Sequence, residues 1–489
     1  MSDCKCDLPH VQVKDGCGPG VKVKVPGTLS ATANLPPDGQ RVQATVSSTG
    51  PVYKGEFVHR ELEYIPHSEA LKWVQENVKV LATAELSEGR VGVVFAQNGK
   101  AKFKILSVEG DAVAMGNTLV FEDDADLTAA ALVELEKGRA AVLYEMDGDG
   151  MAAIITLEGR KSTLAYSDIW AAGCEPANLT ACVLPSGWLL IAATVQQTAP
   201  DLGGHPGECF VWAYRENAQK QSLTHEYLVP ERMDGNNDTD IYTGGWSLAA
   251  VDTLTAVLTF PQALDKPVGF AVIDVDLTGG PGGGLNFRLI SQGKYANSLP
   301  SLQSVGLSLG RWLTAYGVCW LSADRAVNKS GLAFEVWGLS RYAAQLMWYG
   351  CDETRYRASI GNISAASAGP QAVTVTYTGS VQTAGEGGAK SYTDETKAVY
   401  VGLEDGPAPG AAITLPQHSG FCRVVPISVT KALLVWEANG NAYAQYMVLE
   451  ERVIPVKSAM VKIGNGLIDG LALTGGEANE VITIQIPGE

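Results

Sequence analysis

LSEGRVGVVF, at residues 86–95, is a short turn followed by alternating apolar residues that end in an aromatic residue. The chain repeats this phrase as LEKGRAAVLY (135–144), LPSGWLLI (184–191), VDTLTAVLTF (251–260), LGRWLTAY (309–316), GPQAVTVTY (369–377) and VTKALLVW (429–436). The turn glycines of the first three copies, Gly89, Gly138 and Gly187, lie 49 residues apart. A period near 50 residues with several strands per repeat is typical of a β-propeller and not of a helical solenoid.

The seven copies predict an all-β protein, a β-propeller with seven blades over residues 67–454. Residues 1–66 predict a small β-rich N-terminal arm with a cysteine-rich tail, and 455–489 predict a C-terminal β-hairpin tail with strands at 458–463 and 481–486. Between the arm and the first copy, Ser68 is a candidate N-cap for a short helix over 69–77.

The charge and hydropathy of the sequence exclude two kinds of partner, nucleic acid and the membrane interior. A formal net charge of −17 argues against nucleic acid, which needs a concentrated Lys/Arg surface. Membrane insertion is not expected, because the longest apolar run, 188–193, is far shorter than the ~20 residues that span a bilayer. Residues 1–10 contain no hydrophobic signal core. If the protein acts outside a cell, we expect it to leave the cell by lysis or inside a larger particle.

Two stretches contain possible metal ligands, and each has a simpler alternative. Cys4, Cys6, His10 and Cys17 could bind a structural zinc ion at the N-terminus, although the paired Cys-x-x-Cys turns of common zinc sites are absent. The alternative is a cysteine-rich tail without metal. An odd, scattered set of nine cysteines does not form a disulfide framework, and Cys182, Cys209, Cys319 and Cys422 predict small buried core residues. Cys174 and Cys182 could face each other across a hairpin, and a pair of free thiols is the favoured interpretation.

A polar loop places oxygen-bearing side chains at every second position. Asp234, Asn236, Asp238 and Asp240 could gather around a calcium ion, which takes six or more oxygen ligands. The loop lacks the central glycine and the distal glutamate of an EF-hand. A solvated acidic loop is therefore the alternative.

Aromatic residues are dense between 312 and 349. Exposed indole rings could stack on sugars or anchor a protein partner, which makes Trp312, Trp320, Trp337 and Trp348 candidate binding residues. These residues also occupy strand positions, where filling of the blade core explains them. Both interpretations stay open from sequence.

The sequence contains no recognisable catalytic motif. Gly-x-Ser-x-Gly, His-Glu-x-x-His and phosphate-cradling glycine loops are absent, and the six histidines share no spacing. We therefore predict a protein that is not an enzyme.

The C-terminal stretch GLIDGLALTGGEANEVITIQIP (466–487) resembles the ends of many virion proteins from phages and prophages of Gram-positive bacteria. These ends share a Gly-x-Ala-x-Thr-x-Gly turn and a closing amphipathic strand. The repeats are similar to the propeller portions of phage tail and fibre proteins. The resemblance implies a virion structural protein for host adhesion or capsid decoration, assembled in the host cytoplasm and released by lysis. Its implied partners are other virion proteins (capsid, tail or baseplate) and a host surface glycan or protein.

Three functions follow from the sequence. The first is a non-enzymatic virion structural protein, present in several copies per particle because repeated display increases avidity. The second is a carbohydrate-binding lectin or a glycan-active enzyme on the same propeller, with loop carboxylates and the aromatic stretch as its site. The third is an intracellular propeller scaffold for other proteins, which only the fold class favours.

Overall fold

The structure is a computed structural model, and it describes only part of the chain. The described residues are 40–123, 127–196, 208–224, 231–232, 245–261, 267–276, 284–292, 298–307, 310–321, 327–339, 344–356, 360–384, 390–404, 408–410, 412–418, 420–455 and 470–486. All regular elements there are β-strands or single bridges. No described residue belongs to a helix that could cross a membrane.

The chain divides into two compact units. Unit 1 combines both ends, Met1–Glu63 and Glu450–Glu489, and unit 2 is Tyr64–Leu449. The two ends, predicted as an arm and a separate tail, thus belong to one unit.

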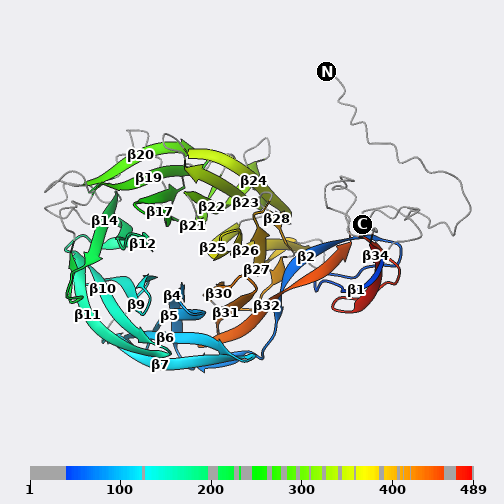
Figure 1. Cartoon of the computed structure of the whole chain (residues 1–489), viewed down its shortest axis with the longest axis horizontal. Helices are drawn as coiled ribbons and strands as arrows, with labels where there is room; N and C mark the ends of the chain where they lie inside the picture. The colour runs from blue at the N-terminus through cyan, green and yellow to red at the C-terminus, as the bar shows by residue number, and fades with distance from the viewer. Residues whose placement is uncertain are drawn as a thin grey trace, which may run out of the picture. The chain divides into compact units, whose positions relative to one another are not determined.

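Unit 2 is a β-propeller whose antiparallel sheets follow one another around a ring (Figure 1). Blade 1 consists of β4 (Val78–Leu86), β5 (Arg90–Gln97), β6 (Lys100–Glu109) and β7 (Ala112–Glu122). Blade 2 consists of β8 (Ala130–Glu136), β9 (Arg139–Met146), β10 (Asp149–Glu158) and β11 (Lys161–Ala171). Blade 3 consists of β12 (Pro176–Val183), β13 (Leu189–Val195), β14 (Cys209–Glu216), β15 (Leu223–Thr224) and β16 (Glu231–Arg232).

The next three blades repeat the arrangement. Blade 4 consists of β17 (Ser247–Asp252), β18 (Thr255–Phe260), β19 (Gly269–Asp276) and β20 (Gly284–Gln292). Blade 5 consists of β21 (Ser298–Gly306), β22 (Arg311–Leu321), β23 (Val327–Leu339) and β24 (Ala344–Tyr356). Blade 6 consists of β25 (Ile360–Gly369), β26 (Ala372–Ala384), β27 (Lys390–Gly402), β28 (Ala408–Pro409) and β29 (Ile413–Thr414).

The propeller prediction is confirmed, but the predicted count of seven blades is wrong, because only six sheets of the structure are separate blades. The strands of the last copy are β30 (Cys422–Ser428), β31 (Lys431–Ala438) and β32 (Asn441–Pro455). They belong to an eight-stranded sheet in which β2 (Phe57–Pro66) and β3 (Leu71–Val74) pair with β32. The last copy supplies three strands, and strands that precede blade 1 complete its sheet.

The repeated phrase corresponds to one structural feature. In each copy it covers the turn after the innermost strand and the second strand that follows. Gly89, Gly138 and Gly187 have φ values of 67°, 87° and 84°, a backbone region that glycine adopts without strain. The next turn of blade 1, Asn98-Gly99, has positive φ at both residues (53° and 69°), as a two-residue type I′ hairpin requires. Because these turns require glycine or asparagine, the repeat can be recognised in the sequence.

The cores lie between neighbouring blades. One apolar cluster joins Leu190 and Val211 of blade 3 to Leu258 and Ile273 of blade 4. Strand β13 is buried along its whole length, since second strands are covered on both faces. Four cysteines of the described chain are buried free thiols, as predicted: Cys174, Cys182, Cys209 and Cys422.

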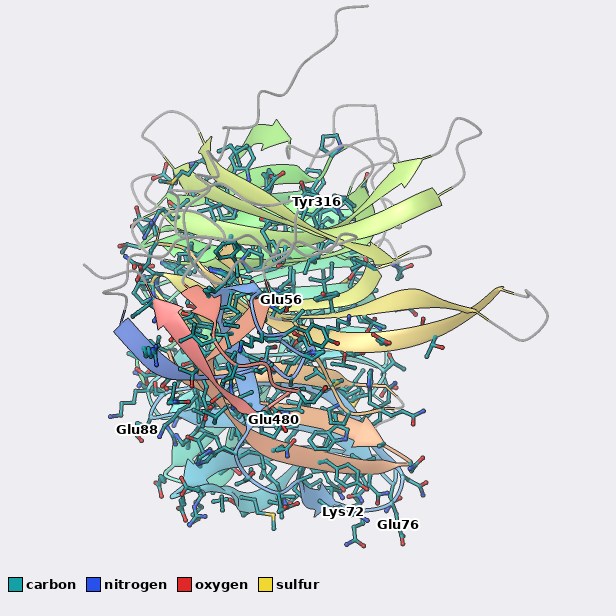
Figure 2. The ribbon with its side chains drawn as sticks, turned by 90° about the vertical axis from the view of Figure 1, so that its right-hand side faces the viewer. Glu56, Lys72, Glu76, Glu88, Tyr316 and Glu480 are labelled. Carbon is teal, nitrogen blue, oxygen red and sulfur yellow. The ribbon has the colours of Figure 1, made fainter. Side chains whose placement is uncertain are left out.

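The short helix predicted over 69–77 is wrong. The stretch contains β3, which pairs antiparallel with β32. Ser68, the expected N-cap, accepts a hydrogen bond at its Oγ from the Tyr446 backbone N–H (3.0 Å) and so holds a strand. The exposed Glu76, with a φ of 64°, follows β3, and its side chain points away from the ribbon (Figure 2). A strand partner almost 400 residues away decides the local structure.

Unit 1 is a small β-structure made from both ends of the chain. Its strand β1 (Gln40–Thr45) pairs antiparallel with β34 (Val481–Ile486), and β34 also pairs with β33 (Gly470–Ala472). An isolated bridge joins Val46 to Val453. The core of the unit is built from Val46, Val52, Val58, Val453, Ala472, Ile482 and Ile484.

The predicted C-terminal hairpin tail is not confirmed. Its expected first strand, 458–463, lies outside the described residues. Its second strand is present as β34, but β34 pairs with β1 from the other end of the chain. A hairpin between sequence neighbours was the simpler expectation, because the sequence gives no signal for pairing across more than 430 residues.

Candidate functional site

The innermost strands of unit 2 enclose a central channel. Contacts between inner strands run in a closed circle from β4 through β8, β12, β17, β21, β25 and β30 back to β4. A cavity of about 370 Å³ lies among them and is lined by residues from all these strands or from the residues directly before them. This is enough room for about a dozen water molecules at ~30 Å³ each.

Small and aliphatic side chains form most of the channel wall. They include Ala82, Ala131, Ala181, Ala365 and Val425. Short side chains leave the interior of the ring open where larger ones would fill it.

Several polar side chains of the wall hold the inner strands together. Thr180 Oγ1 accepts a hydrogen bond from the Leu248 backbone N–H of the next blade (3.1 Å). Ser301 Oγ accepts one from the Ile363 backbone N–H in the same way (2.9 Å). These bonds satisfy edge-strand N–H groups that would otherwise lack partners.

Arg423 and Glu85 are the charged residues among the described ones that line the channel. Arg423 is the second residue of β30, and its guanidinium lies over the ring of Phe421, 5.0 Å from the ring centroid. Burial lowers the pKa of Arg423 from its usual value. Within the described part of the chain, no carboxylate or carbonyl group binds this guanidinium.

Glu85 is the next-to-last residue of β4 and is accessible from the channel. Burial by the surrounding protein and, second, the negative charge of Glu134 raise its pKa to about 7. Glu134 is held in place, because its Oε2 accepts hydrogen bonds from the backbone N–H (2.8 Å) and the hydroxyl (2.7 Å) of Ser87. The proximity of two carboxyl groups accounts for part of the shift.

The two charges lie toward opposite ends of the channel. The turns that follow the inner strands gather at one end, since the Ser186 N–H donates to Thr253 O (3.3 Å) and the Gly310 N–H donates to Val251 O (2.9 Å). Glu85 directly precedes such a turn, whereas Arg423 is at the start of its strand. The channel therefore has an acidic and a basic end.

The structure places two of the four predicted tryptophans in the core. Trp312 and Trp337 are 0% and 3% exposed and stack on each other, with ring centroids 6.2 Å apart. Trp337 Nε1 donates to the buried carboxylate of Glu335 (3.0 Å). Trp312 and Trp337 therefore fill the blade core, which was the second interpretation of these residues.

The other predicted site residues cannot be placed by their side chains. Trp320 and Trp348 belong to β22 and β24, but their side chains are outside the described part of the structure. Cys4, Cys6, His10, Cys17, Asp234, Asn236, Asp238 and Asp240 all lie outside the described residues. Both metal sites stay predictions. Among the residues that are described, no cluster of three or more His, Cys, Asp or Glu side chains could hold a metal ion.

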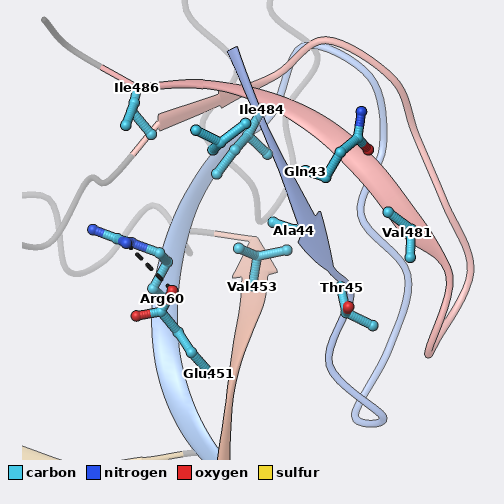
Figure 3. Close-up of a pocket in the computed structure, with 10 residues that line it drawn as sticks. Gln43, Ala44, Thr45, Arg60, Glu451, Val453, Val481, Ile484 and Ile486 are labelled. Atoms are coloured by element: carbon cyan, nitrogen blue, oxygen red, sulfur yellow. Dashed lines mark hydrogen bonds and ion pairs between the residues drawn. The ribbon is translucent and has the colours of Figure 1, made fainter. Parts of the chain in front are cut away.

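Unit 1 has a cleft of its own, of about 420 Å³ (Figure 3). Ile484 and Ile486 line it, as do Arg60 and Glu451, which form an ion pair (3.3 Å). Ile484 is a core residue of the unit, and Ile486 packs against that core. The cleft is thus continuous with the apolar interior of unit 1.

Comparisons with known proteins identify no family for this chain. No protein-family model matches the chain, and no curated protein is similar to it. Among solved structures, the WD40 domain of coronin from Toxoplasma gondii is similar at 12% identity, with 88% of this chain and 93% of that chain covered and a TM-score of 0.44.

Two further solved structures are similar over most of this chain. For a putative 6-phosphogluconolactonase from Bacteroides uniformis, identity is 11%, coverage is 82% of this chain and 100% of that chain, and the TM-score is 0.43. Prolyl oligopeptidase B from Galerina marginata is similar at 8% identity, with 85% of this chain and 52% of that chain covered and a TM-score of 0.41. No functional residue is carried over from these structures.

Arg423 and Glu85 were missed by sequence reasoning. Arg423 is the single charged residue of β30, CRVVPIS, and Glu85 is one of two charged residues in β4, VKVLATAEL. Only the closed ring brings these strands together. An isolated arginine in an apolar inner strand was the one signal available.

Proposed function

We propose that the protein is a non-enzymatic display scaffold of a phage-like particle. Unit 1 attaches the protein to the particle, and the propeller presents a surface for host binding or decoration. The observation that carries this proposal is that β1 and β34, from opposite ends of the chain, pair within a compact unit other than the propeller. An attachment unit built from both ends leaves the ring uninterrupted for display.

The chemistry of the channel supports binding over catalysis. Thr180 and Ser301 accept backbone hydrogen bonds and hold neighbouring blades. Arg423 and Glu85, the charged residues of the described lining, lie toward opposite ends of their inner strands. We further propose that β30, β31 and β32, with β3, act as a seventh sector of the ring.

The alternative function is a lectin or a glycan-active enzyme. Stacking on sugars needs exposed indole faces. The rings of Trp312 and Trp337 are instead engaged in packing. No specific observation favours this alternative.

The test is to isolate the protein from its native source. We expect it to sediment with large particles and to be present in several copies per particle, as mass spectrometry of the particle fraction would measure. Host cells should bind those particles less well after antibody against the propeller is added. Recovery of the protein only as a free monomer would contradict the proposal.

A further inference from the structure

Arg423, which is partly buried, differs from other arginines of the propeller in its lack of a described polar partner. Arg90 donates to Gly159 O (2.6 Å), and Arg139 forms a partly buried ion pair with Glu216. Arg215 donates to Ser186 O (2.8 Å). Arg423 has only the ring of Phe421 beside it within the described part of the chain.

An arginine in this position is costly unless it has a partner. A guanidinium stays charged, and taking it out of water without an anion or acceptors carries a large desolvation penalty. Arg423 is partly buried at the channel wall, and burial lowers its pKa from the usual value. An apolar residue at this position would pack against the same wall at lower cost. The arginine therefore points to a ligand.

We propose that the central channel binds a small oxyanion, a carboxylate or phosphate group, and that Arg423 is the anchoring cation. The planar fork of a guanidinium matches two oxygens of such a group. The proposal is independent of the particle role, because it concerns what the channel takes up.

Neighbouring residues hold the guanidinium and its strand in place. Phe421 supports one face of it, and the Val424 N–H next to it donates to Thr376 Oγ1 of blade 6 (3.1 Å), which fixes β30. A side chain held in place loses less entropy when it binds. The cavity of about 370 Å³ is open to a small molecule, and the hydroxyl of Ser364 lines it as a further polar group.

The other end of the channel restricts which anion fits. Glu85, with Glu134 nearby, becomes negative as pH rises through about 7. A ligand with negative charge at both ends would then be repelled at this end. The site therefore favours a molecule with a single anionic group.

The experiment measures binding to the full chain by thermal unfolding and calorimetry. Inorganic phosphate and acetate are separate probes, with ionic strength held constant by sodium chloride. We expect at least one probe to raise Tm in a saturable way. A response to phosphate alone identifies a phosphate site, and a response to acetate alone identifies a carboxylate site.

Three variants decide whether Arg423 is responsible. Arg423→Gln should raise Kd at least tenfold, and Arg423→Lys should raise it several-fold because lysine lacks the fork. Arg160→Gln, which alters a half-exposed ion pair with Glu109, should bind as the unmodified protein does. Lysine retains the charge and length, so Arg423→Lys serves if the glutamine variant does not fold. The proposal is overturned if neither probe binds, if the Arg423 variants bind normally, or if Arg160→Gln weakens binding equally.

Discussion

Glu85 is the residue at which the channel responds to pH. Its pKa is raised from 4.5 to about 7, first by burial and then by Glu134. The folded protein therefore binds this proton more tightly than the unfolded chain does. The resulting stabilisation is fully present below pH 4.5 and is lost as pH rises through about 7.

Glu85→Gln should remove this pH dependence, because glutamine stays neutral. The free energy of unfolding of the variant, relative to that of the unmodified protein, should increase from pH 5 to pH 8. Since Glu85 is accessible from the channel, we expect a gain of only about 1 kcal/mol. Urea unfolding at both pH values measures it, with the exposed Glu158→Gln as the control. Equal effects of the two substitutions at both pH values would contradict the assignment.

At the scale of the element, the turn after each inner strand determines the repeat. Gly187 has a φ of 84°, and a Cβ there would meet no atom within 4 Å. Gly361 has equal space for a Cβ but no positive φ. Gly187→Ala should therefore lower the free energy of unfolding by about 1–2 kcal/mol through backbone strain alone. Gly361→Ala should leave it within ~0.5 kcal/mol, and equal losses in chemical denaturation would refute the turn assignment.

Neighbouring sheets of the ring are joined by side chains that accept backbone N–H groups. Thr376 Oγ1 does so for Val424, and Thr376 is 1% exposed. Thr376→Val keeps the shape but leaves this N–H unsatisfied, so we expect a loss of about 1–3 kcal/mol. Thr163→Val, at an exposed position of β11, is the control and should be nearly neutral. A thermal unfolding series would show no difference between the two if the bond between blades contributes nothing.

The elements were predictable where local chemistry determines them. The turn glycines and the alternating second strands required no knowledge of distant residues, and both are present as predicted. The helix predicted over 69–77 was wrong for the opposite reason. Leu71 and Val74 suit one face of a helix, but β3 pairs with β32, and that pairing is not encoded locally.

At the scale of the molecule, the sequence predicted the propeller and not its ends. A repeat period reports on blades that resemble one another. It contains no information on how strands from opposite ends combine, so unit 1 and the eight-stranded sheet were not foreseen. The channel was missed for the same reason, since Arg423 and Glu85 line one cavity only when the inner strands form a closed ring.

The central claim is that unit 1 attaches and the propeller displays, and two substitutions in β34 test it. Ile484 is fully buried in the core of unit 1, whereas Val481 is 64% exposed on the same strand. Ile484→Asp buries a carboxylate and should destabilise unit 1 by about 3 kcal/mol or more, while Val481→Asp should be neutral.

The measurement is co-sedimentation of each full-length variant with particles that lack the protein. The account predicts that Val481→Asp sediments as the unmodified protein does. Ile484→Asp should lose at least tenfold in particle binding and keep the main unfolding transition of the propeller. Undiminished sedimentation of Ile484→Asp, with unit 1 shown to be unfolded by proteolysis, would contradict the claim.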